Sequence, residues 1–172
     1  RLRATKQWSL FVELETPLQR ILFDMERRGV FVDADALRAY ALQLVADAER
    51  IEQDIYRLAG HPFNIGSPKQ MQVVLFEELK VQDRGGRRLK KTKTGFSTDE
   101  SVLSKFADEP ICASILEWRM LTKLQNTYVA PLPSCIKAVT GRVHARLRQD
   151  VAATGRLSCE YPNLQNIPMR TP

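Results

Sequence analysis

The sequence predicts a mainly α protein in which a long antiparallel helical pair carries a small tip and is followed by a short β-containing segment. Apolar residues recur at three- and four-residue steps over long stretches, which indicates amphipathic helices. Prolines and glycines beyond residue 130 replace this pattern with turns and a short strand. With 172 residues, 44% of them hydrophobic and 27% charged, the chain is long enough to bury a core.

The first helix is predicted from Lys6 to about Arg28. One apolar face is made by residues at helical spacing: Leu10, Leu14, Leu18, Ile21 and Met25. Pro17 interrupts the pattern and predicts a kink, and Gly29 suits the end of the helix. Residues 30–32 are expected to form a short extended link.

The second helix has the most regular pattern in the chain. Asp33 is a good N-cap residue, and Gly60 ends the pattern. Between them the apolar positions alternate steps of four and three: Leu37, Ala41, Leu44, Ala48, Ile51, Ile55 and Leu58. This spacing is a heptad seam, so we expect the helix to pack lengthwise against a partner helix.

The tip is expected between this helix and the last one. Ser67 is predicted to cap a short helix with Pro68 at its first position. Residues 80–96 read as a loop rich in Lys and Arg. A further helix is expected where Ser97 and Glu100 have the spacing of a capping box.

The last long helix is predicted to open at Pro110 and to extend to about Val129. Pro131 ends it, because proline cannot continue a helix. Residues 140–141 read as a turn before one strand over 142–149.

The composition excludes several classes of function. No apolar run approaches the roughly 20 residues that cross a membrane. Three cysteines and two histidines form no paired spacing, which predicts no zinc site and suits a reducing compartment. Neither a Gly-rich phosphate loop nor a Ser-His-Asp arrangement is present.

Charge favours a polyanion as partner. The chain has 26 Lys and Arg against 20 Asp and Glu, a net charge of +6, and the excess gathers at residues 84–93 and in the C-terminal third. Such a distribution is typical of nucleic-acid binding. A charged run by itself is more often a solubilising loop, so that alternative stays open.

Polar residues near the C-terminus have the chemistry to contact a duplex. Arg156 offers a planar fork of donors and follows Gly155, where the backbone can approach a ligand closely. Asn163, Gln165 and Asn166 add amide donors. Every base pair presents acceptors in the minor groove, so such donors sense pairing without reading sequence. From the residues alone, a polar turn that satisfies its own backbone is the alternative.

Five ordered motifs resemble those of family A DNA polymerases of the bacterial DNA polymerase I type. Four of them are residues 13–18 with 25–30 (ELETPL, MERRGV), 60–65 (GHPFNI), 91–98 (KTKTGFST) and 121–124 with 127–129 (LTKL, TYV). The most specific is the terminal pair of segments, 152–158 (AATGRLS) and 162–168 (PNLQNIP). The resemblance covers nearly the whole chain in collinear order.

The resemblance implies three regions. Residues 1–32 would be the entry helix and link at the start of the polymerase domain, residues 33–130 the thumb, and residues 131–172 a truncated start of the palm. The thumb of this family lies along the minor groove of the primer–template duplex. Arg148 departs from the family, which usually has Asn at that position.

The resemblance also implies which residues contact DNA. At the thumb tip these are Asn64, Ser67, Lys93, Ser97 and Thr98. At the thumb base and in the palm they are Arg119, Lys123, Tyr128, Gln149, Arg156, Asn163, Gln165, Asn166 and Arg170.

The expected function is therefore that of a piece of a DNA-directed DNA polymerase that grips the primer–template duplex during replication and repair. Its partners would be that duplex and the remainder of the polymerase, namely the fingers and the rest of the palm, with no membrane involved. The parent enzyme would use Mg²⁺, whereas this chain is expected to lack catalytic residues, to bind no metal and to be inactive alone. The expected place is the bacterial cytoplasm, at the nucleoid, or a phage-infected cell.

Two alternatives stay open. The chain could be a non-catalytic subunit of a split polymerase that docks a separate catalytic chain, or an unrelated helical scaffold whose basic tip is incidental.

Overall fold

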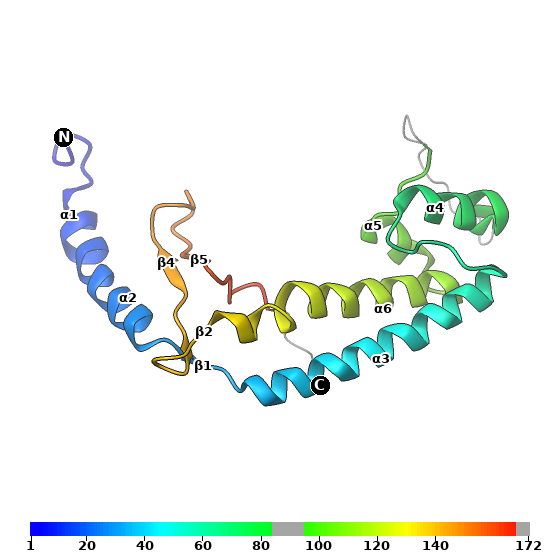
Figure 1. The fold of residues 1–172 in the computed structure, drawn as a ribbon. Coiled ribbons are helices and arrows are strands. Elements are labelled where there is room, and N and C mark those ends of the chain that lie inside the picture. The colour runs from blue at the N-terminus through cyan, green and yellow to red at the C-terminus, as the bar shows by residue number, and fades with distance from the viewer. Residues whose placement is uncertain (84–94, 168–172) are drawn as a thin grey trace. The chain divides into compact units, whose positions relative to one another are not determined.

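The computed structural model describes residues 1–83 and 95–167 and is mainly helical with a few short antiparallel strands, which confirms the predicted fold class (Figure 1). The chain divides into two compact units. One contains residues 1–40 and 126–172, and the other contains residues 41–125. None of the described helices has the length and apolar content that crossing a bilayer requires.

The first unit begins with a continuous helical run, as predicted. Helix α1 (Trp8–Leu10) leads into a π-helical turn, η1 (Phe11–Glu15), and then into α2 (Thr16–Arg28). Pro17 lies in the first turn of α2. Because proline has no N–H to donate, the irregularity falls in the turn just before it. Gly29 ends the helix with φ of 65°.

The strands of this unit are short. Strands β1 (Val30–Phe31), β2 (Ile136–Lys137) and β3 (Arg142–Val143) form an antiparallel sheet in the order β1-β3-β2. Strand β4 (Arg146–Arg148) pairs with β5 (Ser158–Glu160). A 3-10 turn, η6, over Leu132–Cys135 precedes β2. The three-stranded sheet therefore joins the link after α2 to residues 136–143, whereas the two-stranded sheet is formed within residues 146–160.

The prediction of one strand over 142–149 is wrong, because His144 interrupts it. The His144 ring donates from Nδ1 to the backbone carbonyl of Glu26 over 2.8 Å, and its Nε2 accepts from the hydroxyl of Thr140 over 2.7 Å. The ring also packs on Gly29, where an added Cβ would lie 2.8 Å from His144 Cε1. His144, which lies between β3 and β4, thus holds the C-terminal end of α2 in place.

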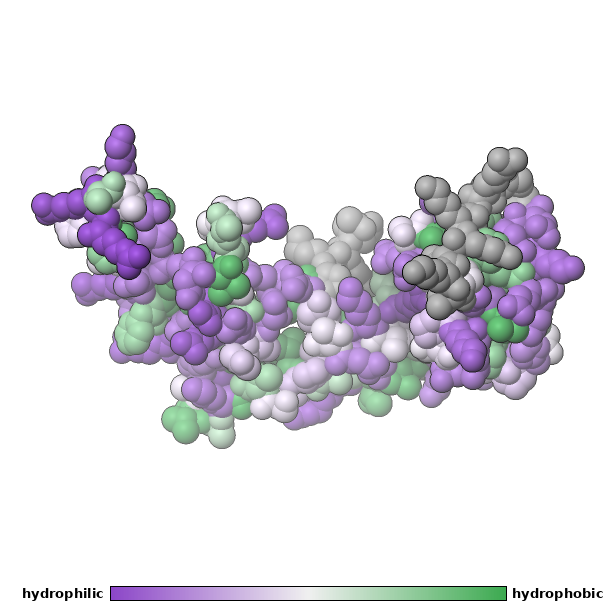
Figure 2. Space-filling model, turned by 90° about the horizontal axis from the view of Figure 1, so that it is seen from above, coloured by the Kyte–Doolittle hydropathy of each residue, from purple (hydrophilic) through white to green (hydrophobic). Residues whose placement is uncertain are grey.

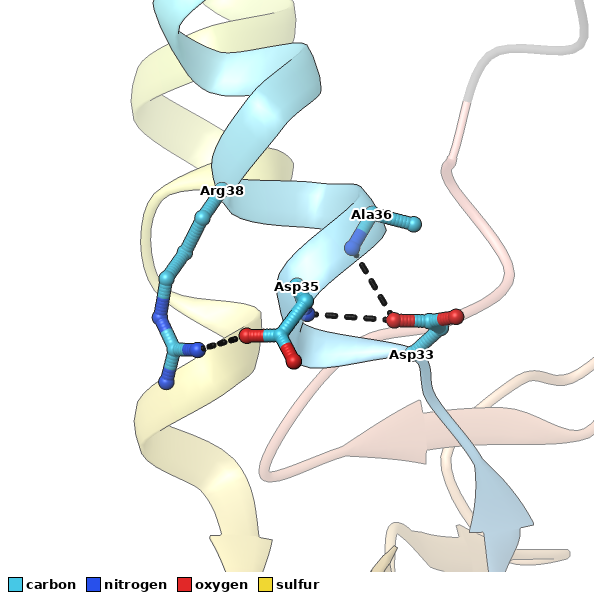
Figure 3. A network of polar contacts seen from close by, with 4 residues as sticks. All are labelled: Asp33, Asp35, Ala36 and Arg38. Carbon is cyan, nitrogen blue, oxygen red and sulfur yellow. Dashed lines mark hydrogen bonds and ion pairs between the residues drawn. The ribbon is translucent and has the colours of Figure 1, made fainter.

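Helix α3 (Ala34–Ala59) begins as predicted. The carboxylate of Asp33 accepts the backbone N–H groups of Asp35 and Ala36 over 3.1 and 2.9 Å, which is N-capping (Figure 3). Asp35 pairs with Arg38 over 2.5 Å at the exposed surface. The cap therefore satisfies two of the amide groups that a helix start leaves without intrahelical partners.

Within the second unit, α3 and α6 (Pro110–Leu124) form the predicted antiparallel helical pair (Figure 1). No member of the heptad seam is exposed, and its fully buried members are Leu44, Ile51 and Ile55. The buried residues of α6 include Ile111, Ile115 and Leu121. A π-helical turn, η5 (Gln125–Val129), continues α6 to the predicted end.

The tip of this unit consists of short helices around its own apolar core. They are α4 (Pro68–Gln72), η2 (Val73–Glu78), η3 (Val81–Asp83), α5 (Glu100–Leu103) and η4 (Ser104–Phe106). The core side chains include Met71, Leu75, Leu103 and Phe106, all without solvent exposure. Short helices of this kind depend on such packing, because isolated helices of this length are unstable.

One cap of the tip is as predicted and one is not. The Ser67 hydroxyl accepts the N–H of Gln70 and caps α4. The capping box between Ser97 and Glu100 is wrong, because α5 begins at Glu100 and its N-cap residue is Asp99. The Ser97 hydroxyl instead accepts the N–H of Asp99 over 3.0 Å, which forms a turn ahead of the helix.

Candidate nucleic-acid interface

An open hollow of about 320 Å³ brings together three of the predicted contact residues. It is lined by Arg156, Leu157, Gln165 and Asn166. Within the described part of the chain, the Arg156 guanidinium has no hydrogen bond or ion pair, and the side chain is exposed. The preceding Gly155 has φ of 79° and open space around it. The hollow therefore presents a free fork of donors beside two amides.

A second hollow of about 240 Å³ lies beside η5, the turn that continues α6. It is lined by Tyr128 and Asn163, by Asn166, which also lines the first hollow, and by the mainly apolar set Thr127, Pro131, Leu132, Pro162 and Ile167. The sequence predicts Pro131 only as the end of a helix. Its position next to the 127–129 motif is the sequence signal that points to this hollow.

The alternative of a self-satisfied polar turn holds for one group here. The side-chain oxygen of Asn163 accepts the backbone N–H of Gln165 over 3.1 Å. The side-chain amide of Gln165 makes no such bond within the described residues. Most amide donors of this segment are thus available to a ligand.

Gln149 points its amide back into the protein. Its Nε2 donates to the carboxylate of Glu15 over 2.7 Å and lies 3.3 Å from the backbone carbonyl of the same residue. The neighbouring Arg148 is engaged as well, since its Nε and a terminal nitrogen donate to the two carboxylate oxygens of Asp150 over 3.0 and 2.7 Å. Hydrogen bonding to Asp150 raises the pKa of Arg148.

In the second unit, three predicted tip contacts keep donors that have no partner among the described residues. Asn64, Ser67 and Ser97 each use a side-chain oxygen to accept a nearby backbone N–H. Their amide and hydroxyl hydrogens are not used by those bonds, so they can donate to a phosphate. Thr98 differs, because its side chain is buried.

The two cations predicted on α6 have different surroundings. Lys123 is exposed and makes no ion pair within the described residues. Arg119 is half-buried, and its guanidinium donates to the backbone carbonyl of Thr98 over 2.6 Å. Lys123 is thus free to meet an anion, whereas Arg119 is occupied inside the unit.

The loop that follows α3 is fastened by an ion pair. The Nε2 of His61 lies 2.7 Å from a carboxylate oxygen of Glu78, and its Nδ1 lies 3.1 Å from the carbonyl of Pro62. The hydrogen bond to Glu78 is the main cause that raises the pKa of His61 above its ordinary value. This pair holds the loop that carries Asn64 against η2.

Two predicted contacts, Lys93 and Arg170, lie outside the described residues, as does the basic run over 84–93. Among the residues that are described, no three His, Cys, Asp or Glu side chains gather in a way that could hold a metal ion.

Comparisons with known proteins agree on one family. Residues 34–172 match the family model for DNA polymerase family A. The chain is 49% identical over 165 residues to the thermostable DNA polymerase I of Thermus thermophilus, which covers 95% of this chain and 19% of that protein. It is 46% identical over 170 residues to DNA polymerase I of Geobacillus stearothermophilus, which covers 98% of this chain and again 19% of the relative.

A solved structure has the same fold. It is the POL domain of Pol1 from M. smegmatis in complex with DNA primer-template and dNTP, and it matches with a TM-score of 0.84 and 38% sequence identity. The match covers 99% of this chain and 29% of that chain. The chain thus spans only part of its relatives, and it belongs to DNA polymerase family A.

Proposed function

We propose that this chain holds the primer–template duplex for template-directed DNA synthesis, as the thumb and the first part of the palm of a DNA polymerase I. The observation that carries the proposal is the hollow lined by Arg156, Gln165 and Asn166, with its free donors. Relatives named DNA polymerase I and a structural neighbour solved with primer-template DNA support the choice of DNA as the ligand.

The proposed contacts separate into two kinds. Arg156, Gln165 and Asn166 would reach base acceptors in the minor groove, which are present at every base pair. Lys123 and the hydroxyl and amide donors of the tip would meet phosphates, which fix the position of the duplex but carry no sequence information. Binding would therefore depend on duplex geometry and charge, with little preference for sequence.

The assignment of regions is part of the proposal. Residues 33–130 would be the thumb, in agreement with a compact unit over 41–125 that has its own core. Residues 1–32 and 131–172 would be the entry to the polymerase domain and the start of the palm. Pairing of β1 with β3 ties these two segments together.

We further propose that the remainder of the polymerase, with the fingers and the rest of the palm, covers the apolar surface of α1, η1 and α2. The exposed side chains there include Trp8, Leu10, Phe11, Leu14, Ile21, Phe23 and Met25. Large apolar side chains exposed in such number along one helical run favour an interaction site, and the relatives are about five times as long as this chain. In the split-polymerase alternative the same surface would dock a separate chain. Measuring the size of the purified chain in solution tests that alternative, because a chain that is purely monomeric argues against a constitutive partner.

The family implies two Mg²⁺ ions in the parent enzyme, held by aspartates. The described residues offer no cluster that fits such a site, so no catalytic step through a metal follows from them. The proposed setting is the cytoplasm of a bacterium or of a phage-infected cell.

The first experiment is a gel with the purified chain, a labelled primer–template, dNTPs and Mg²⁺, read for shift and for extension. A shift without extension supports a DNA-holding piece that needs the rest of the enzyme. The affinity should fall steeply with salt, because phosphate contacts release counterions. An affinity that does not respond to salt, or no shift at all, would contradict the proposal.

A matched pair of variants tests the hollow. Arg156→Ala should weaken duplex binding about tenfold, the scale of one lost charged hydrogen bond. Arg148→Ala removes the same charge, but that arginine is engaged by Asp150, so its loss should change affinity by about twofold at most. Titration of labelled duplex by fluorescence anisotropy measures both, and equal losses would show that only net charge matters.

A further inference from the structure

A hydrogen bond to the side chain of Gln70 joins the loop before α4 to that helix. The backbone N–H of Asn64 donates to Oε1 of Gln70 over 2.7 Å, across six residues. Because a backbone N–H can only donate, the group that meets it has to be the oxygen of the Gln70 amide. This bond therefore fixes both the orientation of that amide and the position of the backbone at Asn64.

The acceptors of Asn64 are used within the loop itself. Its carbonyl accepts the N–H of Ser67 over 3.0 Å, and its side-chain oxygen accepts the N–H of Gly66 over 2.9 Å. A side-chain oxygen that bonds the backbone two residues further on forms an Asx turn. The side-chain Nδ2 of Asn64 has no partner among the described residues, so its direction follows from how the backbone of residue 64 is held.

The arrangement is an extended form of a capping box. In the ordinary motif, the residue three positions after the N-cap bonds to the N–H of the N-cap residue. Ser67 is the N-cap of α4 and its hydroxyl accepts the N–H of Gln70, but the N–H of Ser67 is already used by Asn64. The side chain of Gln70 reaches past Ser67 to Asn64 instead. Helix α4 thus orients residue 64 as well as its own N-cap.

Other contacts hold the rest of the loop. Ile65 is 3% exposed, and the ring centroids of Phe63 and Tyr56 on α3 lie 6.0 Å apart in an edge-to-face arrangement. Asn64 and Gln70 are both exposed. A hydrogen bond between exposed groups contributes little to global stability, so its loss should leave the fold intact and change mainly the position of residue 64.

We infer that Gln70 is a positioning residue for DNA binding, which holds the backbone of Asn64 so that the Nδ2 donor of Asn64 faces a phosphate of the duplex. Gln70 acts through Asn64 in this role. The inference rests on the proposed function, since Asn64 is one of the tip donors assigned to the duplex.

A double-mutant cycle in the 172-residue chain tests this role. Gln70→Leu keeps the helix propensity but removes the acceptor, so it should weaken duplex affinity about fivefold, the scale of one net hydrogen bond. Asn64→Ala should weaken it by a similar factor. The double variant should lose little more than either single variant, because residues that act as a unit are not additive. Losses that multiply to about twenty-fivefold would mean that each residue acts on the duplex by itself, which would overturn the inference.

A matched control is available on α3. Gln53 is exposed and its side chain makes no hydrogen bond within the described residues. Gln53→Leu should therefore bind duplex like wild type when all variants are titrated by fluorescence anisotropy. The same fivefold loss in this control, or wild-type affinity in Gln70→Leu, would overturn the role of Gln70.

Hydrogen exchange read by NMR without DNA supplies a second, local readout. The amide of Asn64 should exchange about threefold to tenfold faster in Gln70→Leu. Gln70→Glu keeps an acceptor of the same length, so it should restore the wild-type exchange rate even though its negative charge weakens duplex binding. Unchanged exchange of Asn64 in Gln70→Leu would show that the bond is absent in solution. A lower midpoint of urea unfolding with wild-type affinity of the folded chain would show a role that is only stabilising, and either result would overturn the inference.

Failure of the proposed function is distinguishable from failure of the inference. If the wild-type chain binds no duplex, the proposed function fails and the role of Gln70 in DNA binding falls with it. The bond between Gln70 and Asn64 is then still upheld or overturned by the exchange data alone.

Discussion

Helices α2 and α3 have the same kind of apolar periodicity but different surroundings. In α3 the seam residues Leu44, Ile51 and Ile55 are at most 3% exposed. In α2 the equivalent stripe is open to solvent, with Ile21 at 57% and Met25 at 55%. Figure 2 shows apolar side chains at the surface where α2 lies in Figure 1.

This difference shows the limit of what apolar periodicity predicts. The periodicity predicts that one face of a helix packs against an apolar partner, but it does not predict whether the same chain supplies that partner. Burial of apolar area contributes roughly 25 cal/mol per Å², so α3 is stabilised from within its own unit. Helix α2 is instead fastened at its end, by polar contacts of Glu26 and by the packing of His144 on Gly29.

The largest expected effect compares the same substitution on both helices. Ile55→Ala, at a fully buried position, should lower the free energy of unfolding by about 2–5 kcal/mol. Ile21→Ala, at an exposed position, should change it by no more than about 0.5 kcal/mol. Urea unfolding followed by far-ultraviolet circular dichroism measures both. Equal losses would mean that the face of α2 is buried in solution, for example in a dimer.

A second prediction concerns the fastening of α2. Gly29→Ala should destabilise the first unit by at least about 1–3 kcal/mol, because φ is 65° and a Cβ would approach the His144 ring and the carbonyl of Val143 within 2.9 Å. Gly141→Ala is the matched control, since Gly141 has φ of 64° but open space around it. Thermal unfolding of the two variants gives the comparison. A cost for Gly29→Ala no larger than that for Gly141→Ala would show that the packing of His144 is unimportant.

The smallest expected effect is a pH dependence in the second unit. The pKa of His61 is raised above 6.5 in the folded chain, mainly by its hydrogen bond to Glu78. The stabilisation of the folded unit by the pair of His61 and Glu78 is therefore complete below the pKa that His61 has in the unfolded chain. It is lost as pH rises through the higher pKa that His61 has in the folded chain. Hydrogen exchange of the loop over residues 61–65 should accordingly show weaker protection at about pH 8 than at about pH 6, after correction for intrinsic rates. Glu78→Gln should remove this difference, and an unchanged difference would rule out the pair as its source.

Most of the helices could be predicted because their signals are local. The cap at Asp33, the stop at Gly29 and the seam of α3 each depend on residues within a few turns of one another. The short strands could not be predicted in this way, since β1 pairs with β3 across more than a hundred residues. The break at His144 has the same origin, because its partner is the carbonyl of Glu26.

In the candidate site, too, some features could be predicted from the sequence and others depend on distant segments. The resemblance selected Arg156, Gln165 and Asn166, and the structure gathers them around one hollow. The residue types alone could not show that Gln149 donates to Glu15 or that Arg119 donates to a buried carbonyl. Those engagements depend on distant segments, so the same residue type is free at one position and occupied at another.

The sequence by itself determined the helical pair, the cap at Asp33 and the family, because periodicity, capping and motifs are properties of neighbouring residues. Only the tertiary structure decided which apolar face is covered and which polar side chain is free. Covering a face and satisfying a donor both require a partner that the chain brings from far away in sequence, as α6 does for α3 and as Thr98 does for Arg119.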